Sequence, residues 1–233
     1  MAKRLIFLPM TEAPFVREFE VEFKWFPGMA KSQAQKSILS LHDASLALGY
    51  GPILEISSKS PDPLGVALSA FNLTVNSCIG CRPISVESAF QGSKVFETGG
   101  PFEDLYNASS LDAKRDDRIR NSGRIIKFSY YGQSFPTQPV TAFYNWLYIR
   151  ALSQNEHLAR QLQNYAGFTD IAFNSKKSWN CQASAAAVYL SLLQRAEVQK
   201  AVMDPNWFIS IISENGFQSP HNREGQGLLE LEE

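Results

Sequence analysis

Cysteine is scarce in this 233-residue chain, which contains only Cys78, Cys81 and Cys181. An odd and small number of cysteines argues against a disulfide-stabilised scaffold and favours a reducing compartment. Cys78 and Cys81 form a C-x-x-C motif, the spacing of a redox dithiol or of half a zinc site. Because no second C-x-x-C and no H-x-x-x-H follows it, we expect a pair of adventitious thiols.

Histidine is equally sparse, and the three residues are scattered without the spacing of metal ligands: His42, His157 and His221. We therefore expect no metal and no cofactor. The chain also lacks a G-x-S-x-G elbow, a Walker A loop and a G-x-G-x-x-G turn. Their absence disfavours a hydrolase triad, an NTPase and a dinucleotide-binding fold.

Long apolar runs are missing as well. The opening MAKRLIFLPM is too short in its apolar part for a signal peptide, and no small-residue cleavage site follows it. No segment approaches the ~20 apolar residues that a membrane span requires. We expect a soluble, cytoplasmic protein that does not bind a membrane. The formal net charge of −1 indicates that any contact with nucleic acid is local and weak.

The remaining composition is that of an ordinary globular protein, with 44% hydrophobic and 19% charged residues. Alternation over 18–25 and the apolar run at 4–8 predict two strands, and helical periodicity follows over 31–48. The other predicted strands are 51–57, one near 82–85 and 124–131; the other predicted helices begin near residue 86 and span about 137–152, 155–165, 180–195 and 204–213. The pattern predicts a mainly helical α+β domain with a small sheet over 1–213, which opens with a strand–strand–helix unit. Residues 214–233 lack a core-forming period and are expected to be a flexible tail.

Two short stretches carry most of the chemistry: LSAFNLTV at 68–75 and SVESAFQGSKVF at 85–96. Ser85 is suited to cap a helix in which Glu87, Gln91 and Lys94 share one polar face. A carboxylate above a polar strip on a rigid helix is a common way to hold a functional group in position.

These stretches resemble the NADAR family of YbiA-like proteins. The first part of the family pattern corresponds to 69–72, which reads S-A-F-N; the second part corresponds to Glu87, Phe90, Gln91 and Lys94. The resemblance continues through 155–171, with Asp170 as its acidic residue, and through 180–192, which opens with Asn180. The lead-in at 23–73 is similar to the branch of NADAR antitoxins that accompanies DarT-type toxins. That resemblance implies removal of ADP-ribose from guanine in single-stranded DNA, with the toxin as functional partner.

Three residues are candidates for the catalytic step. Hydrolysis at an anomeric carbon requires a group that protonates the leaving nitrogen, activates water or holds the ribose hydroxyls, and we assign Glu87 to that role. The competing interpretation is a solvent-facing glutamate near the helix N-terminus, where the helix dipole favours a negative charge. A lysine amine can also attack the anomeric carbon of an opened sugar, and Lys36 and Lys59 are the leading candidates. Ordinary surface lysines are the competing interpretation.

Seven polar residues are expected to bind the substrate. The serines of the loop at 57–60 can cradle a diphosphate, and the amides and Asp170 can hydrogen-bond the sugar. A polar turn and buried structural amides are the competing interpretations. The full set is Ser57, Ser58, Asn72, Gln91, Lys94, Asp170 and Asn180.

A basic stretch over 112–127 holds six basic and three acidic residues, a local charge of +3. Together with nearby aromatic residues it is the best candidate for a DNA path, with Lys114, Arg115 and Arg118 as its contacts. A solvated surface helix is the competing interpretation.

Two other functions compete with removal of ADP-ribose from DNA. One is N-glycosidase action on a phosphoribosylamino-pyrimidine intermediate of riboflavin synthesis, which the wider family also implies. The other is a non-enzymatic module that binds ADP-ribose or the toxin itself.

Overall fold

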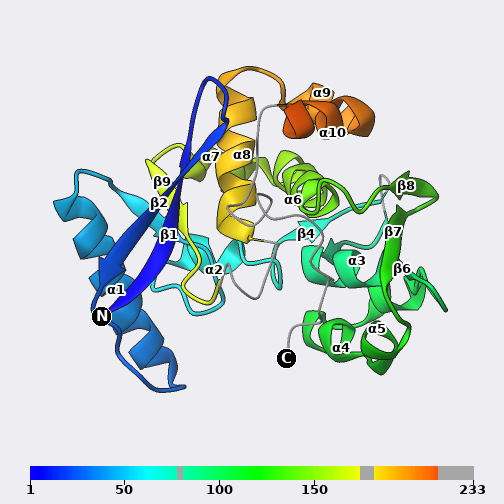
Figure 1. Ribbon diagram of the computed structural model, residues 1–233, viewed down its shortest axis with the longest axis horizontal. Helices are drawn as coiled ribbons and strands as arrows, with labels where there is room; N and C mark the ends of the chain where they lie inside the picture. The colour runs from blue at the N-terminus through cyan, green and yellow to red at the C-terminus, as the bar shows by residue number, and fades with distance from the viewer. Residues whose placement is uncertain (78–80, 174–180, 215–233) are drawn as a thin grey trace.

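The computed structural model describes residues 1–77, 81–173 and 181–214. Its largest sheet has the strand order β2-β1-β9-β3 (Figure 1). The long hairpin of β1 and β2 pairs antiparallel in one register from Ala2 opposite Phe23 to Pro9 opposite Val16. β9 pairs antiparallel with β1 and parallel with β3. The four strands are β1 Ala2–Pro9, β2 Val16–Phe23, β3 Ile53–Glu55 and β9 Gly167–Thr169.

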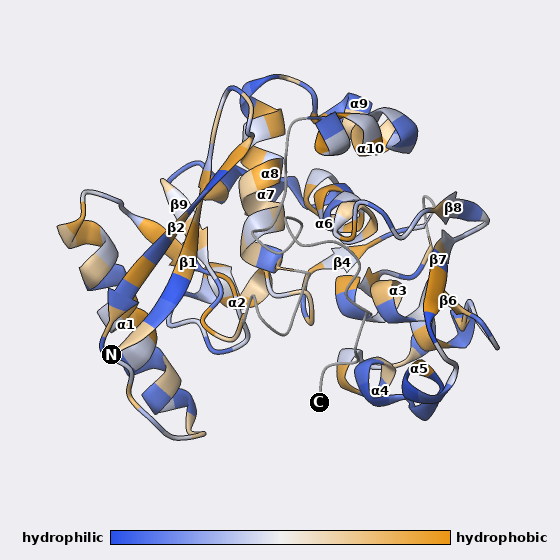
Figure 2. Ribbon diagram, viewed as in Figure 1, coloured by the Kyte–Doolittle hydropathy of each residue, from blue (hydrophilic) through white to orange (hydrophobic). Residues whose placement is uncertain are grey.

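A helix covers each face of this sheet. α1 (Lys31–Ala47) packs Ile38 and Leu41 against strand residues such as Ile6 and Val21. α8 (Gln182–Gln194) contacts β1, β2 and β9. α8 is apolar over most of its length because it is enclosed between the sheet and α6 (Ala142–Gln154) (Figure 2).

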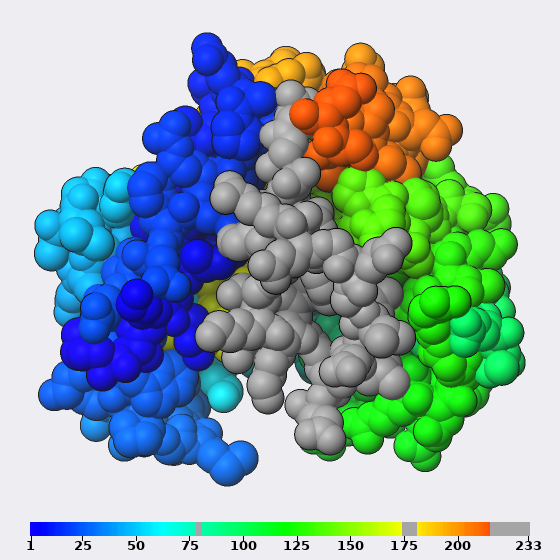
Figure 3. Space-filling model, viewed as in Figure 1, coloured from blue at the N-terminus to red at the C-terminus, as the bar shows by residue number. Residues whose placement is uncertain are grey.

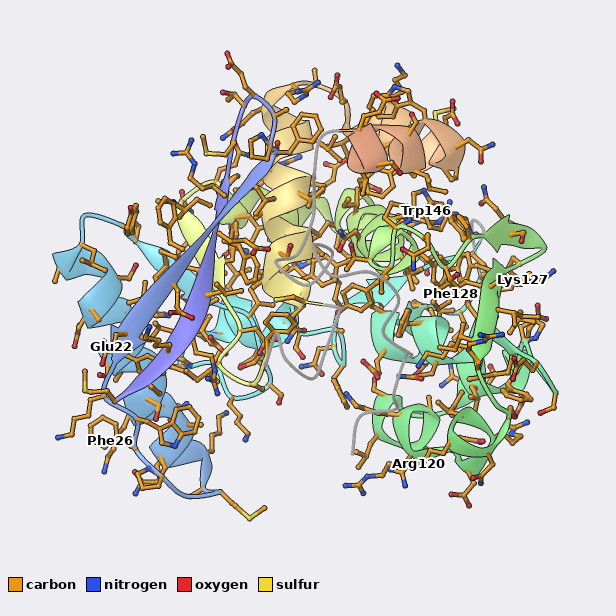
Figure 4. All side chains as sticks on the ribbon, in the orientation of Figure 1. Glu22, Phe26, Arg120, Lys127, Phe128 and Trp146 are labelled. Carbon is orange, nitrogen blue, oxygen red and sulfur yellow. The ribbon has the colours of Figure 1, made fainter. Side chains whose placement is uncertain are left out.

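The other half of the molecule is built on aromatic packing. Phe90 from α3 (Val86–Gly92) stacks on Phe128 of the second sheet, with ring centroids 5.5 Å apart, and on Phe143 of α6 at 6.1 Å. Trp146 joins the same cluster through Phe135, and both Phe128 and Trp146 are labelled in Figure 4. The second sheet has the order β6-β7-β8, with β6 Lys94–Phe96, β7 Ile125–Tyr130 and β8 Gln133–Phe135.

Shorter elements connect and frame these two halves. A two-stranded ribbon pairs β4 and β5 directly before α3. The short elements are α2 Pro63–Ala67, β4 Thr74–Val75, β5 Ile84–Ser85, the 3-10 helix η1 Glu103–Asn107, α4 Ser110–Arg115, α5 Asp117–Asn121, α7 Glu156–Leu162, α9 Val198–Met203 and α10 Pro205–Glu214.

The structure confirms the predicted α+β class with more helix than strand. It corrects the expectation that Lys94 lies on the helix of Glu87, because α3 ends at Gly92 and Lys94 begins β6. The expectation of free thiols is wrong for Cys81, which is disulfide-bonded, whereas Cys181 is a buried free thiol.

The predicted tail begins at Glu214, the last residue of α10, and its remaining residues lie outside the described part of the chain. Within residues 1–77, 81–173 and 181–214, no helix is both long and apolar enough to cross a membrane.

Candidate functional site

Glu87 occupies the first turn of α3, where the sequence predicted it. Ser85 caps the helix, since its hydroxyl accepts a hydrogen bond from the Ser88 amide at 3.1 Å. The Glu87 amide donates to the Ala70 carbonyl at 2.9 Å, which ties the start of α3 to the segment 69–72. The two stretches singled out in the sequence are therefore in direct contact.

The Glu87 side chain is buried rather than solvated, with a residue exposure of 7%. Its Oε1 accepts a hydrogen bond from Gln91 Nε2 at 2.9 Å and lies 3.9 Å from Lys114 Nζ. Gln91 is one turn along the same helix, as predicted. Its own Oε1 is buried and has no hydrogen-bond partner among the described residues. The pair thus presents a carboxylate and a buried acceptor in one place.

Lys114 reaches Glu87 because α4 is fixed against α3. Ser110 Oγ lies 2.9 Å from the Phe71 carbonyl and 2.7 Å from Ser85 Oγ, and hydrogen-bonds with both. Lys114 follows Ser110 by four residues and so projects from the same face of the helix. Its ammonium lies 5.8 Å from the ring centroid of Phe71. The S-A-F-N segment therefore supplies an aromatic ring beside the carboxylate.

Asp170 approaches from the other half of the molecule, directly after β9. Its Oδ2 accepts from Gln182 Nε2 at 2.9 Å, and its Oδ1 accepts from the Ala172 amide at 3.0 Å. Gln182 Oε1 in turn accepts from the Ala70 amide at 2.8 Å. One amide side chain thus connects Asp170 to the residue whose carbonyl binds the Glu87 amide.

Burial raises the pKa of Asp170 to about 6, although the hydrogen bond from Gln182, those from the backbone and the charge of Lys114 act to lower it. This places the titration of the carboxyl near neutral pH. Such a group can exchange a proton during a reaction at physiological pH.

Glu55 forms a second carboxyl layer behind Asp170. It ends β3, is fully buried, and accepts hydrogen bonds from Thr169 Oγ1 at 2.8 Å and from the Ile171 amide at 2.9 Å. Burial, followed by the charge of Asp170, raises the pKa of Glu55 to about 8. Glu55 is therefore neutral at pH 7 and does not repel the Asp170 carboxylate.

The two predicted lysine nucleophiles are both exposed. Lys36 is exposed on α1, and Lys59 is exposed on the loop after β3, where its amide donates to Ser57 Oγ at 3.3 Å. Gln35 Nε2 donates to the Ser60 carbonyl at 3.5 Å, so α1 and this loop are neighbours. Among the described residues, neither lysine forms a hydrogen bond or an ion pair with Glu87.

The predicted substrate-binding residues differ in their burial and in their contacts. Ser57 is buried and hydrogen-bonds Glu55, whereas Ser58 is exposed. Asn72 is exposed, and its Nδ2 donates to the Val66 carbonyl at 2.8 Å. Lys94 is buried with its ammonium 4.9 Å from the Phe90 ring centroid. Asn180 lies outside the described residues.

The predicted DNA-contacting residues differ in their ion pairs and in their exposure. Arg118 pairs with Asp104 at 2.6 Å and with Asp116 at 2.9 Å. Arg115 is exposed on α4, directly after Lys114. Arg120 and Lys127 project at the periphery (Figure 4). Only Lys114 therefore joins the carboxylates.

Sequence reasoning missed Glu55, Gln182 and the place of Lys114 beside Glu87. Glu55 had a usable signal, because a single acidic residue interrupts the apolar run ILEI. Gln182 lies two residues after Asn180, which the sequence analysis assigned to substrate binding. The space-filling view shows the N-terminal part of the chain on one side of the molecule and the part that contains α4 and α5 on the other (Figure 3).

The comparison with known families covers nearly the whole chain. The family model of the DarT1-associated NADAR antitoxins matches residues 2–222. No curated protein matches the sequence. The chain therefore belongs to the family of DarT1-associated NADAR antitoxins, and this membership supports an antitoxin role in a DarT system.

Proposed function

We propose that this protein hydrolyses the N-glycosidic bond between ADP-ribose and guanine in single-stranded DNA, and so reverses the modification made by a DarT-type toxin. The observation that carries the proposal is the buried carboxylate of Glu87. It is oriented by Gln91, lies beside Lys114, and is connected through Ala70 and Gln182 to Asp170. Two carboxyl groups with different surroundings suit acid–base work at an anomeric carbon.

Glu87 has the direct role in this proposal. As the bond from the anomeric carbon to the base nitrogen breaks, positive charge develops on the sugar, and a nearby carboxylate stabilises it. Asp170 can hold the ribose hydroxyls or accept the proton of the attacking water, since its pKa of about 6 leaves it mostly ionised at neutral pH. Gln91 Oε1 offers a buried acceptor to a hydroxyl or N–H of the substrate.

A covalent route through Lys36 or Lys59 is part of the same proposal. The Nζ–C1 bond would form as C1 loses its bond to the guanine nitrogen, and the proton released by the amine would pass to that nitrogen. The resulting glycosylamine would open to an imine as the C1–O4′ bond breaks and O4′ takes the remaining N–H proton. Water would then hydrolyse the imine and free the lysine. The nearness of α1 to the loop at 57–60 supports considering both lysines together.

The other proposed contacts follow the predicted set. Ser57, Ser58, Asn72, Lys94 and Asn180 would bind the nucleotide, and the DNA strand would pass along α4 and α5. Of the three predicted DNA contacts, Arg115 is the best placed for a phosphate, because Arg118 is already paired with Asp104 and Asp116.

Glu87→Gln tests the catalytic role. The amide keeps an oxygen that can accept the Gln91 hydrogen bond, so the fold should persist, while the charge is lost. We expect release of ADP-ribose from ADP-ribosylated guanine DNA to fall by at least ~10²-fold. Glu103→Gln, at an exposed position on η1, is the matched control and should retain the wild-type rate. A wild-type rate in Glu87→Gln would remove Glu87 from the mechanism.

Borohydride trapping tests the lysine route. The wild-type protein is reduced during turnover, and the site of any covalent sugar is read by mass spectrometry in wild type, Lys36→Ala and Lys59→Ala. An adduct that disappears in one variant identifies the nucleophile. Normal turnover with no adduct at either lysine excludes this route. Absence of turnover by the isolated chain, with ADP-ribose still bound, would favour the binding module instead.

A further inference from the structure

Lys114 faces two carboxyl groups that come from opposite halves of the molecule. Its ammonium lies 3.9 Å from Glu87 Oε1, and its charge also acts on Asp170 after β9. The side chain is 44% exposed, against 9% for that of Glu87, so Lys114 is the solvent-accessible partner of this ion pair.

The position of Lys114 is fixed by its neighbours. Ser109 caps α4, Ser110 ties the helix to Phe71 and Ser85, and the ring of Phe71 lies beside the Lys114 ammonium. A lysine that only contacts DNA phosphates needs no such attachment.

We propose that Lys114 is a positioning residue of the active site, whose ammonium holds the Glu87 carboxylate in place and favours the ionised form of Asp170. The inference rests on the proposed function and moves Lys114 from the DNA path to the carboxylate pair. Its physical basis is electrostatic: a cation within a few ångströms favours the charged form of a carboxylate, and burial and like-charge repulsion oppose it.

The other titratable groups around Asp170 set the balance. Glu55 of β3 is neutral at pH 7 and adds negative charge only above its pKa of about 8, whereas Arg4 of β1 interacts favourably with both Asp170 and Glu55. Cys181, Tyr144 and Tyr148 face the same carboxyl and carry no charge at neutral pH, since burial raises each of their pKa values. Among the described residues, Lys114 of α4 and Arg4 of β1 are therefore two cations that act on Asp170.

The test compares Lys114→Met with Lys114→Arg across a pH series of ADP-ribose release. We expect the acidic limb of the profile to move up by about one pH unit in Lys114→Met, so that the rate below the midpoint falls about tenfold and the rate above it is largely kept. Lys114→Arg should restore most of the wild-type profile. Arg17→Met, at an exposed position on β2 outside the proposed site, is the control and should leave the profile unchanged.

Two results would overturn the proposal. One is an equal loss of rate at every pH in Lys114→Met. The other is an unchanged pH profile with only a weaker salt-dependent affinity for single-stranded DNA, which would return Lys114 to the DNA path.

A second measurement separates this proposal from the proposed function. The Asp170 carboxyl is titrated by ¹³C NMR in the full-length protein without substrate, and its midpoint should rise in Lys114→Met but not in Arg17→Met. If the wild type releases no ADP-ribose, the glycohydrolase proposal fails while this titration still reports on Lys114. An Asp170 midpoint that does not move contradicts the positioning role whether or not the enzyme turns over.

Discussion

Glu55→Gln should make the protein more stable at alkaline pH. Glu55 is fully buried at the end of β3, and its pKa is raised to about 8 from an ordinary value of 4.5. Between these two values the unfolded chain loses the proton and the folded protein keeps it. The native state therefore binds more protons than the unfolded state, and the free energy of unfolding falls as the pH rises through this window. Below it, the contribution of Glu55 is fully retained.

The size of the effect follows from the same two values. The interval from 4.5 to about 8, at about 1.4 kcal/mol per pH unit, sets an upper limit of about 5 kcal/mol. A glutamine mimics the neutral acid and does not titrate. Near pH 5 we expect the variant to lie within about 1 kcal/mol of wild type, the scale of one altered hydrogen bond. Near pH 8 it should be more stable by several kcal/mol.

Urea unfolding at a series of pH values measures this difference. Asp170 and Glu18, whose burial raises the pKa to about 6 and about 7, act in the same direction. Both residues are present in the two proteins, so the comparison largely removes their contribution. Glu103→Gln, at an exposed position, provides a variant whose curve should run parallel to wild type. If the stabilities of Glu55→Gln and wild type differ by the same amount at every pH, Glu55 does not titrate as described and the reasoning is wrong.

Two further substitutions probe the supports of the site. Gly65→Ala would bring a Cβ against the Glu55 carbonyl oxygen and Ser60 Oγ. We expect the free energy of unfolding in urea to fall by about 3 kcal/mol, the scale of overpacking. A free energy equal to that of wild type would show that the loop at 57–60 can move aside. Gln182→Leu removes both hydrogen bonds that join Asp170 to Ala70. We expect the free energy of unfolding to fall by about 2 kcal/mol because polar groups lose their partners, and the titration midpoint of Asp170 to rise in ¹³C NMR. An unchanged midpoint would mean that the Gln182 amide does not act on the Asp170 carboxylate.

Local signals allowed much of the fold to be predicted. The alternation in β2, the periodicity of α1 and the Ser85 cap before Glu87 each depend on a few neighbouring residues, and the structure confirms them. Lys94 was misplaced because helical spacing was extended past Gly92, where the chain turns into β6. Strand β9 was missed because three residues carry too little pattern, although β9 pairs with both β1 and β3.

The site was predicted in part for the same reason. Glu87 and Gln91 lie one helical turn apart, so their spacing alone brings them together. Lys114 and Gln182 reach the carboxylates through contacts between distant segments, such as the bond of Ser110 to Phe71 and that of Gln182 to Ala70. The sequence placed Lys114 in a charge run, and only the packing of α4 on α3 directs it toward Glu87.

The Gln182 side chain gives the site a dependence on the complete fold. Its two hydrogen bonds join segments separated by 112 residues on one side and 12 on the other. Glu87 and Asp170 are accordingly connected only after α8 has packed, so a nascent or truncated chain that stops before α8 lacks this connection. Under the proposed function, such an antitoxin would begin to remove ADP-ribose from DNA only after the ribosome has released the segment that contains α8.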